Sequence, residues 1–170
     1  MDFICWTKNR FNRAVWGFAG NCGWYDYSFA EEPEFPGADF KTKTIMGRVV
    51  WNDAHFVDLK KTDPEYTDEL IDRLERDIEY LENRVDTIVS VTHHLGFKEM
   101  LREKPGDKLW AFANAFMGST KLGKMLIKHP KVKTHICGHN HRPCRNQIEH
   151  LESVNPGSTY GEKNYVVLEV

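Results

Sequence analysis

The hydrophobic pattern of the chain is clearest in the segment 67–84, where it has the period of an amphipathic helix. Apolar side chains recur there at intervals of three or four residues, at Leu70, Leu74, Ile78, Leu81 and Val85. Residues at this spacing lie on one side of an α-helix, and the positions between them are mostly charged. Thr67, followed by two acidic residues, is the expected N-cap. The pattern predicts a helix that covers a core with one face and is solvated on the other.

Runs of β-branched and apolar residues predict strands before and after this helix. The expected strands lie at 49–51, 87–92, 131–137, 146–155 and 164–170. The run at 87–92 is mostly apolar, as in a buried strand. Helices are expected at 108–117 and 119–129, the second capped by Ser119 or Thr120. Strands that alternate with helices predict the α/β class.

The composition is that of an ordinary globular domain. The chain has 170 residues, of which 41% are hydrophobic and 28% charged, enough to bury a core in one domain. Its formal net charge of -2 provides no basic field for nucleic acid or an anionic membrane. No apolar run resembles a signal peptide or approaches membrane-spanning length. We therefore expect a single domain over residues 1–170, located in the cytoplasm, without membrane or nucleic-acid partners.

Candidate chemistry is concentrated in the histidines. Eight are present, and four of them form two tight groups, His93 with His94 and His139 with His141. Each group directly follows a predicted strand, at the edge of an α/β sheet where binding sites are commonly built. The four cysteines are too sparse for a disulfide framework, so we expect reduced thiols.

One interpretation of the second group is a closed structural zinc site. Its ligands would be Cys137, His139, His141 and Cys144. Structural zinc is usually bound by two short ligand pairs separated by a longer loop, whereas these four residues span only one short stretch. The chain would need a severe local wrap to surround an ion. We therefore expect the cysteines to take no part in metal binding.

The other interpretation is an open metal site. On extended backbone His139 and His141 point to the same side, and Gly138 lets the chain turn beside them. His93, at the end of the earlier strand, completes a set of three imidazoles, which suits zinc, iron or manganese. A polar loop with incidental histidines is the structural alternative. We favour the open site because the two groups follow different strands.

Two aromatic segments also carry acidic residues. GWYDYSF contains Asp26, and WNDAHF contains Asp53 and His55. We interpret these carboxylates as hydrogen-bonded partners of the packed aromatic rings. A role facing a substrate is the alternative for the same residues.

The ordered series of motifs resembles the C-terminal half of the calcineurin-like metallophosphoesterases. The series is a strand ending in VTHH, a later strand ending in GHNH, then NPGS and a final strand. GNCGWYDYSF and WNDAHF resemble a bacterial-type subgroup, so the resemblance covers nearly the whole chain. It implies a β-sandwich flanked by helices, the α/β/β/α architecture, here in partial form. It also implies that phosphate esters are hydrolysed at a pair of divalent metal ions.

The resemblance implies roles for individual residues. His93 and His139 are implied to bind one metal ion and His141 the other, the metal being manganese, iron or zinc. His94 and Arg142 follow these ligands in the chain, and we expect them to contact the substrate phosphate, for which a guanidinium is suited.

The first three motifs of that family are missing. They are Asp-x-His, Gly-Asp, and Gly-Asn-His followed by an acidic residue. GNC at 20–22 has cysteine in place of the histidine, and we do not expect Asn21 to bind metal. We therefore expect the chain to be the C-terminal part of the fold, without its N-terminal strands.

The missing motifs change what the site is expected to hold. Carboxylates offset the repulsion between two nearby cations, so the histidines alone would bind one ion or none. The missing strands would also leave a sheet edge exposed, which favours homo-oligomers. The alternative function is a non-catalytic assembly domain that binds at most one metal ion through the three histidines.

Overall fold

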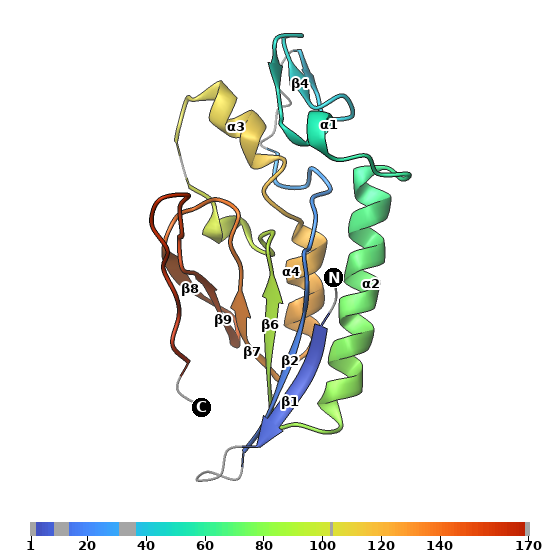
Figure 1. Ribbon diagram of the computed structural model, residues 1–170, viewed down its shortest axis with the longest axis vertical. Coiled ribbons are helices and arrows are strands. Elements are labelled where there is room, and N and C mark those ends of the chain that lie inside the picture. The colour runs from blue at the N-terminus through green and yellow to red at the C-terminus, as the bar shows by residue number, and fades with distance from the viewer. Residues whose placement is uncertain (1–2, 9–13, 31–36, 103, 169–170) are drawn as a thin grey trace.

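A six-stranded sheet forms the centre of the structure (Figure 1). The computed structural model describes residues 3–8, 14–30, 37–102 and 104–168. The strands are β1 (Phe3–Lys8), β2 (Val15–Asn21), β6 (Thr87–Thr92), β7 (Val132–Ile136), β8 (Cys144–Ile148) and β9 (Leu151–Asn155). Their order across the sheet is β1-β2-β6-β7-β9-β8. The four central strands are parallel, and the two edge strands β1 and β8 are antiparallel to their neighbours.

Two helices lie side by side against this sheet, α2 (Asp63–Glu82) and α4 (Thr120–Lys128) (Figure 1). The main hydrophobic core lies between these helices and the strands. The predicted apolar stripe of α2 is confirmed, because Leu70, Leu74, Ile78 and Leu81 are all buried. The strand and helix alternation also confirms the predicted α/β class.

The predicted start of α2 is wrong by about one turn. The helix begins at Asp63, and Thr62 is its N-cap, in a capping box with Glu65. Pro64 in the first turn fits this start, because its missing N–H has no partner to lose there. Thr67 lies inside the helix, where its hydroxyl donates to the carbonyl of Tyr25 at 2.7 Å.

Smaller elements lie above the carboxyl end of the sheet (Figure 1). A three-stranded sheet is formed by β3 (Ala38–Asp39), β4 (Thr44–Ile45) and β5 (Val49–Val50). The helices α1 (Asp53–Phe56) and α3 (Lys108–Asn114) and the 3-10 helix η1 (Lys98–Met100) complete this region. A second, smaller core joins it to the rest, built on Tyr25, Ile45, Phe112, Ala115 and Phe116.

Two strand predictions near the C-terminus are wrong. The segment 146–155 is not one strand, because a turn at Glu149, whose φ is 51°, separates β8 from β9. Residues 164–168 form no strand, since no strand within the described residues pairs with them, and Tyr165 is 84% exposed. Residues 169–170 lie outside the described residues.

The homo-oligomer expected from the sequence would form through an exposed edge strand of the sheet. β1 is an edge strand, and Phe3 and Ile4 on it are exposed at 42% and 40%. Association through this edge stays a prediction. Within the described residues, no helix combines the length and hydrophobicity needed to cross a membrane.

Candidate metal site

The two loops that carry the histidine groups meet at one edge of the sheet. β6 and β7 are parallel neighbours, with Val91 opposite Ile136 near their carboxyl ends. His93 and His94 follow β6 directly, and His139 lies three residues beyond β7. The backbone N–H of Gly138 donates to the carbonyl of His93 at 3.0 Å, so the two loops are joined at this point.

His93 and His139 are in direct contact. Nε2 of His93 lies 3.1 Å from Nδ1 of His139, and the ring centroids are 4.9 Å apart. Nε2 of His139 lies 3.2 Å from the carbonyl oxygen of Phe116. Because a carbonyl only accepts, that nitrogen carries the proton, and Nδ1 of His139 accepts from Nε2–H of His93. The pair is therefore held in one defined arrangement of neutral imidazoles.

His94 is buried behind this pair. Only 3% of it is exposed, and its ring centroid lies 4.3 Å from that of His139. Nδ1 lies 3.2 Å from the carbonyl of Cys22, so it donates and Nε2 keeps its lone pair. Nε2 is buried and has no hydrogen-bond partner among the described residues. A substrate phosphate would reach His94 only if the rings around it moved, and the expected phosphate contact stays a prediction.

Desolvation favours the neutral form of these histidines, although the side chain of His93 is partly open to solvent. Desolvation, with a smaller effect of His93, lowers the pKa of His139 to about 4. Desolvation also lowers the pKa of His93, and it holds the pKa of His94 well below its usual range. Neutral imidazole is the form that binds metal ions, so the cluster is ready to donate lone pairs at neutral pH.

The loop from Gly138 to Arg142 differs from the extended backbone assumed in the sequence. His139 and His141 have φ angles of 65° and 55°, in the left-handed region. Asn155 fixes this shape, because its side-chain amide donates to the carbonyl of Gly138 and to Oδ1 of Asn140, both at 2.7 Å. The extended backbone from which a shared direction of the two rings was predicted is therefore absent at these two residues, and their joint role in metal binding stays a prediction.

His141 and Arg142 lie at the exposed rim of the site. The ring of His141 packs edge-on against Tyr160, with centroids 5.3 Å apart. The guanidinium of Arg142 donates from Nη1 to the carbonyl of Leu101 at 2.7 Å. Among the described residues, no hydrogen bond or ring contact is found between either side chain and the His93–His139 pair, although a charge on His141 would lower the pKa of both histidines. The predicted roles of His141 and Arg142 stay predictions.

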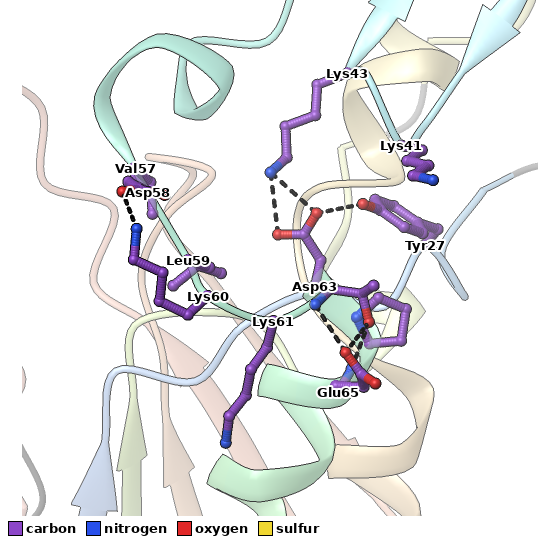
Figure 2. A pocket seen from close by; sticks show the side chains of 12 residues that line it. Tyr27, Lys41, Lys43, Val57, Asp58, Leu59, Lys60, Lys61, Asp63 and Glu65 are labelled. Carbon is purple, nitrogen blue, oxygen red and sulfur yellow. Dashed lines mark hydrogen bonds and ion pairs between the residues drawn. The ribbon is translucent and has the colours of Figure 1, made fainter.

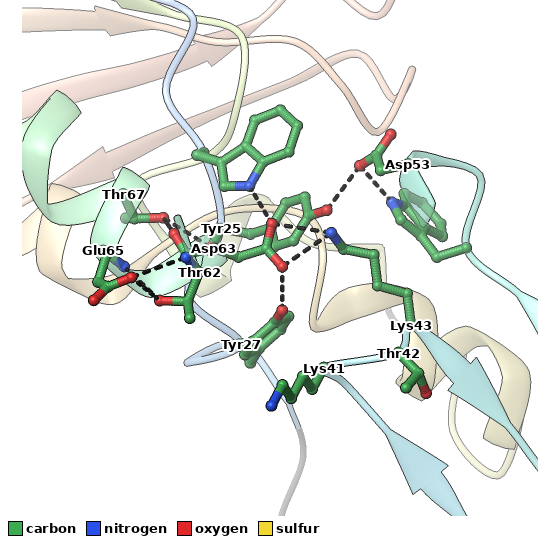
Figure 3. A network of polar contacts seen from close by, with 12 residues as sticks. Tyr25, Tyr27, Lys41, Thr42, Lys43, Asp53, Thr62, Asp63, Glu65 and Thr67 are labelled. Atoms are coloured by element: carbon green, nitrogen blue, oxygen red, sulfur yellow. Dashed lines mark hydrogen bonds and ion pairs between the residues drawn. The ribbon is translucent and has the colours of Figure 1, made fainter. Parts of the chain in front are cut away.

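Asp53 is an acidic residue whose charge acts on both His93 and His139. Its Oδ2 accepts hydrogen bonds from Tyr25 Oη at 2.9 Å and Trp51 Nε1 at 2.8 Å, which confirms the hydrogen-bonded interpretation (Figure 3). Its negative charge opposes the fall in the pKa of both His93 and His139. The sequence shows an acidic residue within WNDAHF. It does not predict that the charge of this residue acts on the two histidines.

A buried carboxylate, Asp63, holds the aromatic segment beneath the histidines. It accepts from Trp24 Nε1 at 2.7 Å, from the hydroxyl of Tyr27, and from the ammonium of Lys43 (Figure 3). The rings of Trp24 and Tyr25 in turn pack against His94, with centroids 5.0 and 5.7 Å away. Through Asp63, the N-terminus of α2 thereby holds in place the aromatic rings that pack against His94.

A cavity of about 730 Å³ lies beside Asp63 (Figure 2). Four lysines and three acidic residues line it together with Tyr27, Val57, Leu59, Thr62 and Pro64. Lys60 pairs with Asp58, and Lys61 pairs with Glu69. The charges of this cavity are therefore largely balanced within the protein.

The thiols of Cys137 and Cys144 are hydrogen-bonded to backbone carbonyls. The thiol of Cys137 is buried and donates to the carbonyl of Val154 at 3.7 Å, and that of Cys144 donates to Met100 O at 3.8 Å. Burial raises the pKa of Cys137 to about 12 and also raises that of Cys144. The expectation that the cysteines take no part in metal binding stays a prediction.

The fit of a metal ion can be tested on the observed nitrogen atoms. Two nitrogens bound to one ion at about 2.1 Å, at roughly 90–110°, lie about 3.0–3.4 Å apart. The 3.1 Å between His93 Nε2 and His139 Nδ1 falls within this range. Binding an ion at both nitrogens requires the other neutral tautomer of His93, with its proton on Nδ1, so that Nε2 offers a lone pair. Throughout the described part of the chain, however, no three His, Cys, Asp or Glu side chains are placed to hold a metal together. The site thus offers a two-imidazole ligand pair and not a complete centre.

Comparison with known proteins supports the fold. The structure is similar to that of phosphopantetheinyl hydrolase from Mycobacterium tuberculosis, with a TM-score of 0.66 and 18% sequence identity. The likeness covers 91% of this chain and 54% of that protein, so the chain spans about half its length. The chain shares the fold of the matched part of that protein. At this identity the likeness concerns the fold alone.

Two further structures are more distant. A candidate 5′-nucleotidase from Staphylococcus aureus has a TM-score of 0.46 and 16% identity, and covers 91% of this chain and 24% of that one. GAP50, the anchor in the inner membrane complex of Plasmodium, has a TM-score of 0.45 and 11% identity, with 93% and 37% covered. No protein-family model and no curated protein sequence matches the chain.

Proposed function

We propose that the chain is the C-terminal part of a metal-dependent phosphoesterase and that His93 and His139 bind a divalent cation. The observation that carries this proposal is the 3.1 Å approach of His93 Nε2 and His139 Nδ1. The metallophosphoesterase-type fold supports phosphate esters as the substrate class. A bound cation would polarise a phosphoryl oxygen and so favour hydrolysis.

The chain's own residues contribute binding and orientation. Phe116 O and Asn155 fix the tautomer of His139 and the loop that carries it. Asp53 adds a negative charge that favours a cation beside the histidines. Arg142, exposed on the same loop, is suited to bind a phosphate oxygen. The remaining ligands of a complete centre would be the acidic motifs that the family resemblance implies and that the given sequence lacks.

Metal binding and hydrolysis can be measured separately. Calorimetry with Mn²⁺ should detect one bound ion. His93→Ala or His139→Ala should lower the affinity for Mn²⁺ at least ~100-fold, since mutating even a residue that only contacts a metal ligand lowers the affinity about 10–100-fold. His55→Ala, an exposed histidine outside the cluster, is the matched control and should leave binding unchanged. Equal binding in all variants would refute the ligand assignment.

Hydrolysis is then tested with p-nitrophenyl phosphate and bis-p-nitrophenyl phosphate in the presence of Mn²⁺. Activity of this chain, or of a longer gene product carrying the Asp-x-His and Gly-Asp motifs, would support the proposal if it is lost in His139→Ala. No activity in either form would refute it.

A non-catalytic assembly domain is the second candidate. The observation that favours it is the lack of a third metal ligand among the described residues. One ion bound without hydrolysis of either ester, in either form of the protein, would favour this alternative.

A further inference from the structure

A cavity of about 480 Å³ lies on the side of the histidine loop where Arg142 is found. Its walls are Lys98, Glu99, Leu101, Arg102 and Arg142. Three of these side chains are cationic and one is acidic, so the cavity carries an excess of positive charge. This distinguishes it from the larger cavity beside Asp63, where lysines and carboxylates are paired.

The wall formed by residues 99–102 is fixed although it begins in the short helix η1 and continues as irregular chain. Its four consecutive carbonyls each accept a hydrogen bond from a side chain of another segment. The donors, in order, are Asn146, Asn140, Arg142 and Trp110, at 2.9, 2.7, 2.7 and 2.6 Å. A wall held in this way needs little reordering when a ligand binds, which reduces the entropic cost of binding.

The cationic groups keep donors available. Arg142 uses Nη1 for the carbonyl of Leu101, while a guanidinium has five N–H donors in all. The guanidinium of Arg102 lies 5.7 Å from the centroid of the Trp110 ring, which restrains it without using its N–H groups. Such forked donors match the oxygens of a phosphate group.

The cavity is close to the proposed metal ligands. Arg142 is three residues after His139, and consecutive Cα atoms are about 3.8 Å apart, so their Cα atoms lie within about 11 Å. Asn140, between them, joins both sides, because it donates to Met100 and accepts from Asn155. A small molecule could therefore occupy the histidine site and this cavity at once.

We propose that this cavity, lined by Lys98, Arg102 and Arg142, binds a second phosphate group of the substrate. The inference rests on the proposed phosphoesterase function and narrows its substrate to esters that carry two phosphate groups. A phosphate dianion matches the excess charge of the cavity, and the fixed 99–102 wall sets its distance from the reacting ester.

Binding is tested without turnover, by calorimetry with inorganic pyrophosphate in buffer stripped of metal ions by a chelating resin. The variant is Lys98→Gln/Arg102→Gln/Arg142→Gln, whose three side chains are exposed. The matched control, Arg84→Gln/Lys124→Gln/Lys133→Gln, removes the same charge from exposed positions elsewhere. We expect affinity to fall at least ~10-fold in the first variant and to stay within about twofold in the second, because hydrogen bonds to charged groups contribute strongly.

Other outcomes overturn the inference. Absence of pyrophosphate binding to the wild type, or an equal loss in both variants, would show that the cavity is no specific phosphate site, whether or not the chain hydrolyses esters. Where hydrolysis is measurable, Lys98→Gln/Arg102→Gln, which leaves Arg142 in place, should raise KM for a nucleoside diphosphate and leave KM for p-nitrophenyl phosphate unchanged. A failure of hydrolysis with normal pyrophosphate binding would count against the proposed function alone.

Discussion

The ammonium of Lys43 lies 2.9 Å from Oδ2 of Asp63, and the two residues are only 8% and 7% exposed. The same carboxylate accepts hydrogen bonds from Trp24 and Tyr27, so its charge is surrounded by donors. The pair links the small sheet to the first turn of α2. Because a buried charge is costly without its partner, this relationship makes a direct prediction about stability.

Asp63→Asn should destabilise the protein by about 3 kcal/mol, the range found when one partner of a buried ion pair is removed. The control is Asp68→Asn, whose partner Lys121 is 2.6 Å away in a pair that is about half exposed. Exposed pairs contribute about 0–1 kcal/mol, so the control should change little. Urea unfolding measures both free energies. Equal losses would contradict the importance assigned to Asp63.

Acid should weaken the fold through His135. This histidine is fully buried, and desolvation lowers its pKa to about 4. Thr92 Oγ1 donates to the carbonyl of His94 and accepts from Nε2 of His135, whose Nδ1 faces Ser153 Oγ at 3.2 Å. The neutral ring is therefore the form that the native state holds.

The sign follows from the lowered pKa. Unfolding returns His135 to a pKa of about 6.5, so its contribution is fully present above that pH and is lost as pH falls toward 4. The slope is at most about 1.4 kcal/mol per pH unit for one proton. His135→Gln should make the free energy of unfolding less dependent on pH between about pH 4 and 6.5, by at most the slope that one proton produces. Urea unfolding at several pH values measures this dependence. An unchanged slope would show that His135 does not titrate in this way.

The continuous hydrophobic patterns were predictable because local sequence decides them. The strand at 87–92 was predicted with its observed bounds, and the apolar stripe of α2 is buried as expected. β2 was not predicted, because Gly17 and Gly20 weaken its strand pattern. A Cβ at Gly17 would lie 3.1 Å from Leu81, and one at Gly20 would lie 2.2 Å from the carbonyl of Val91. Glycine is required at these positions because elements distant in the sequence pack closely against them, and no local sequence pattern reveals this packing.

Some features of the candidate site were also predictable from the sequence, and others were not. The meeting of His93 with His139 followed from two strands whose ends share one edge of a sheet. The positions of His141 and Asp53 did not, because they depend on distant hydrogen bonds. Asn155 sets the left-handed backbone of the histidine loop, and Tyr25 with Trp51 fixes Asp53.

The thiols should be dispensable for metal binding. Cys137→Ser/Cys144→Ser is expected to leave the Mn²⁺ and Zn²⁺ content of the protein unchanged, measured by elemental analysis. Iodoacetamide near pH 8 should modify the exposed Cys5 and spare Cys137, whose pKa of about 12 and burial both suppress the thiolate. Loss of bound metal in the double variant would restore the closed zinc interpretation.

Gly157 should be required for the shape of the histidine loop. Its φ is 76°, and a Cβ there would lie 2.2 Å from the backbone nitrogen of Pro143. Its N–H also donates to Oδ1 of Asn155, the residue that fixes the loop through Gly138. Gly157→Ala should therefore cost about 2 kcal/mol or more, from strained backbone and overpacking together.

The control for this prediction is Gly161→Ala, because a Cβ at Gly161 meets no atom within 4 Å in the described structure. A surface change of this kind should stay within about 0.5 kcal/mol. Urea unfolding gives the stabilities, and Mn²⁺ calorimetry of the folded Gly157→Ala protein should show weakened binding, because the displaced loop carries His139. Unchanged stability and metal affinity in Gly157→Ala would contradict the coupling between this turn and the histidine loop.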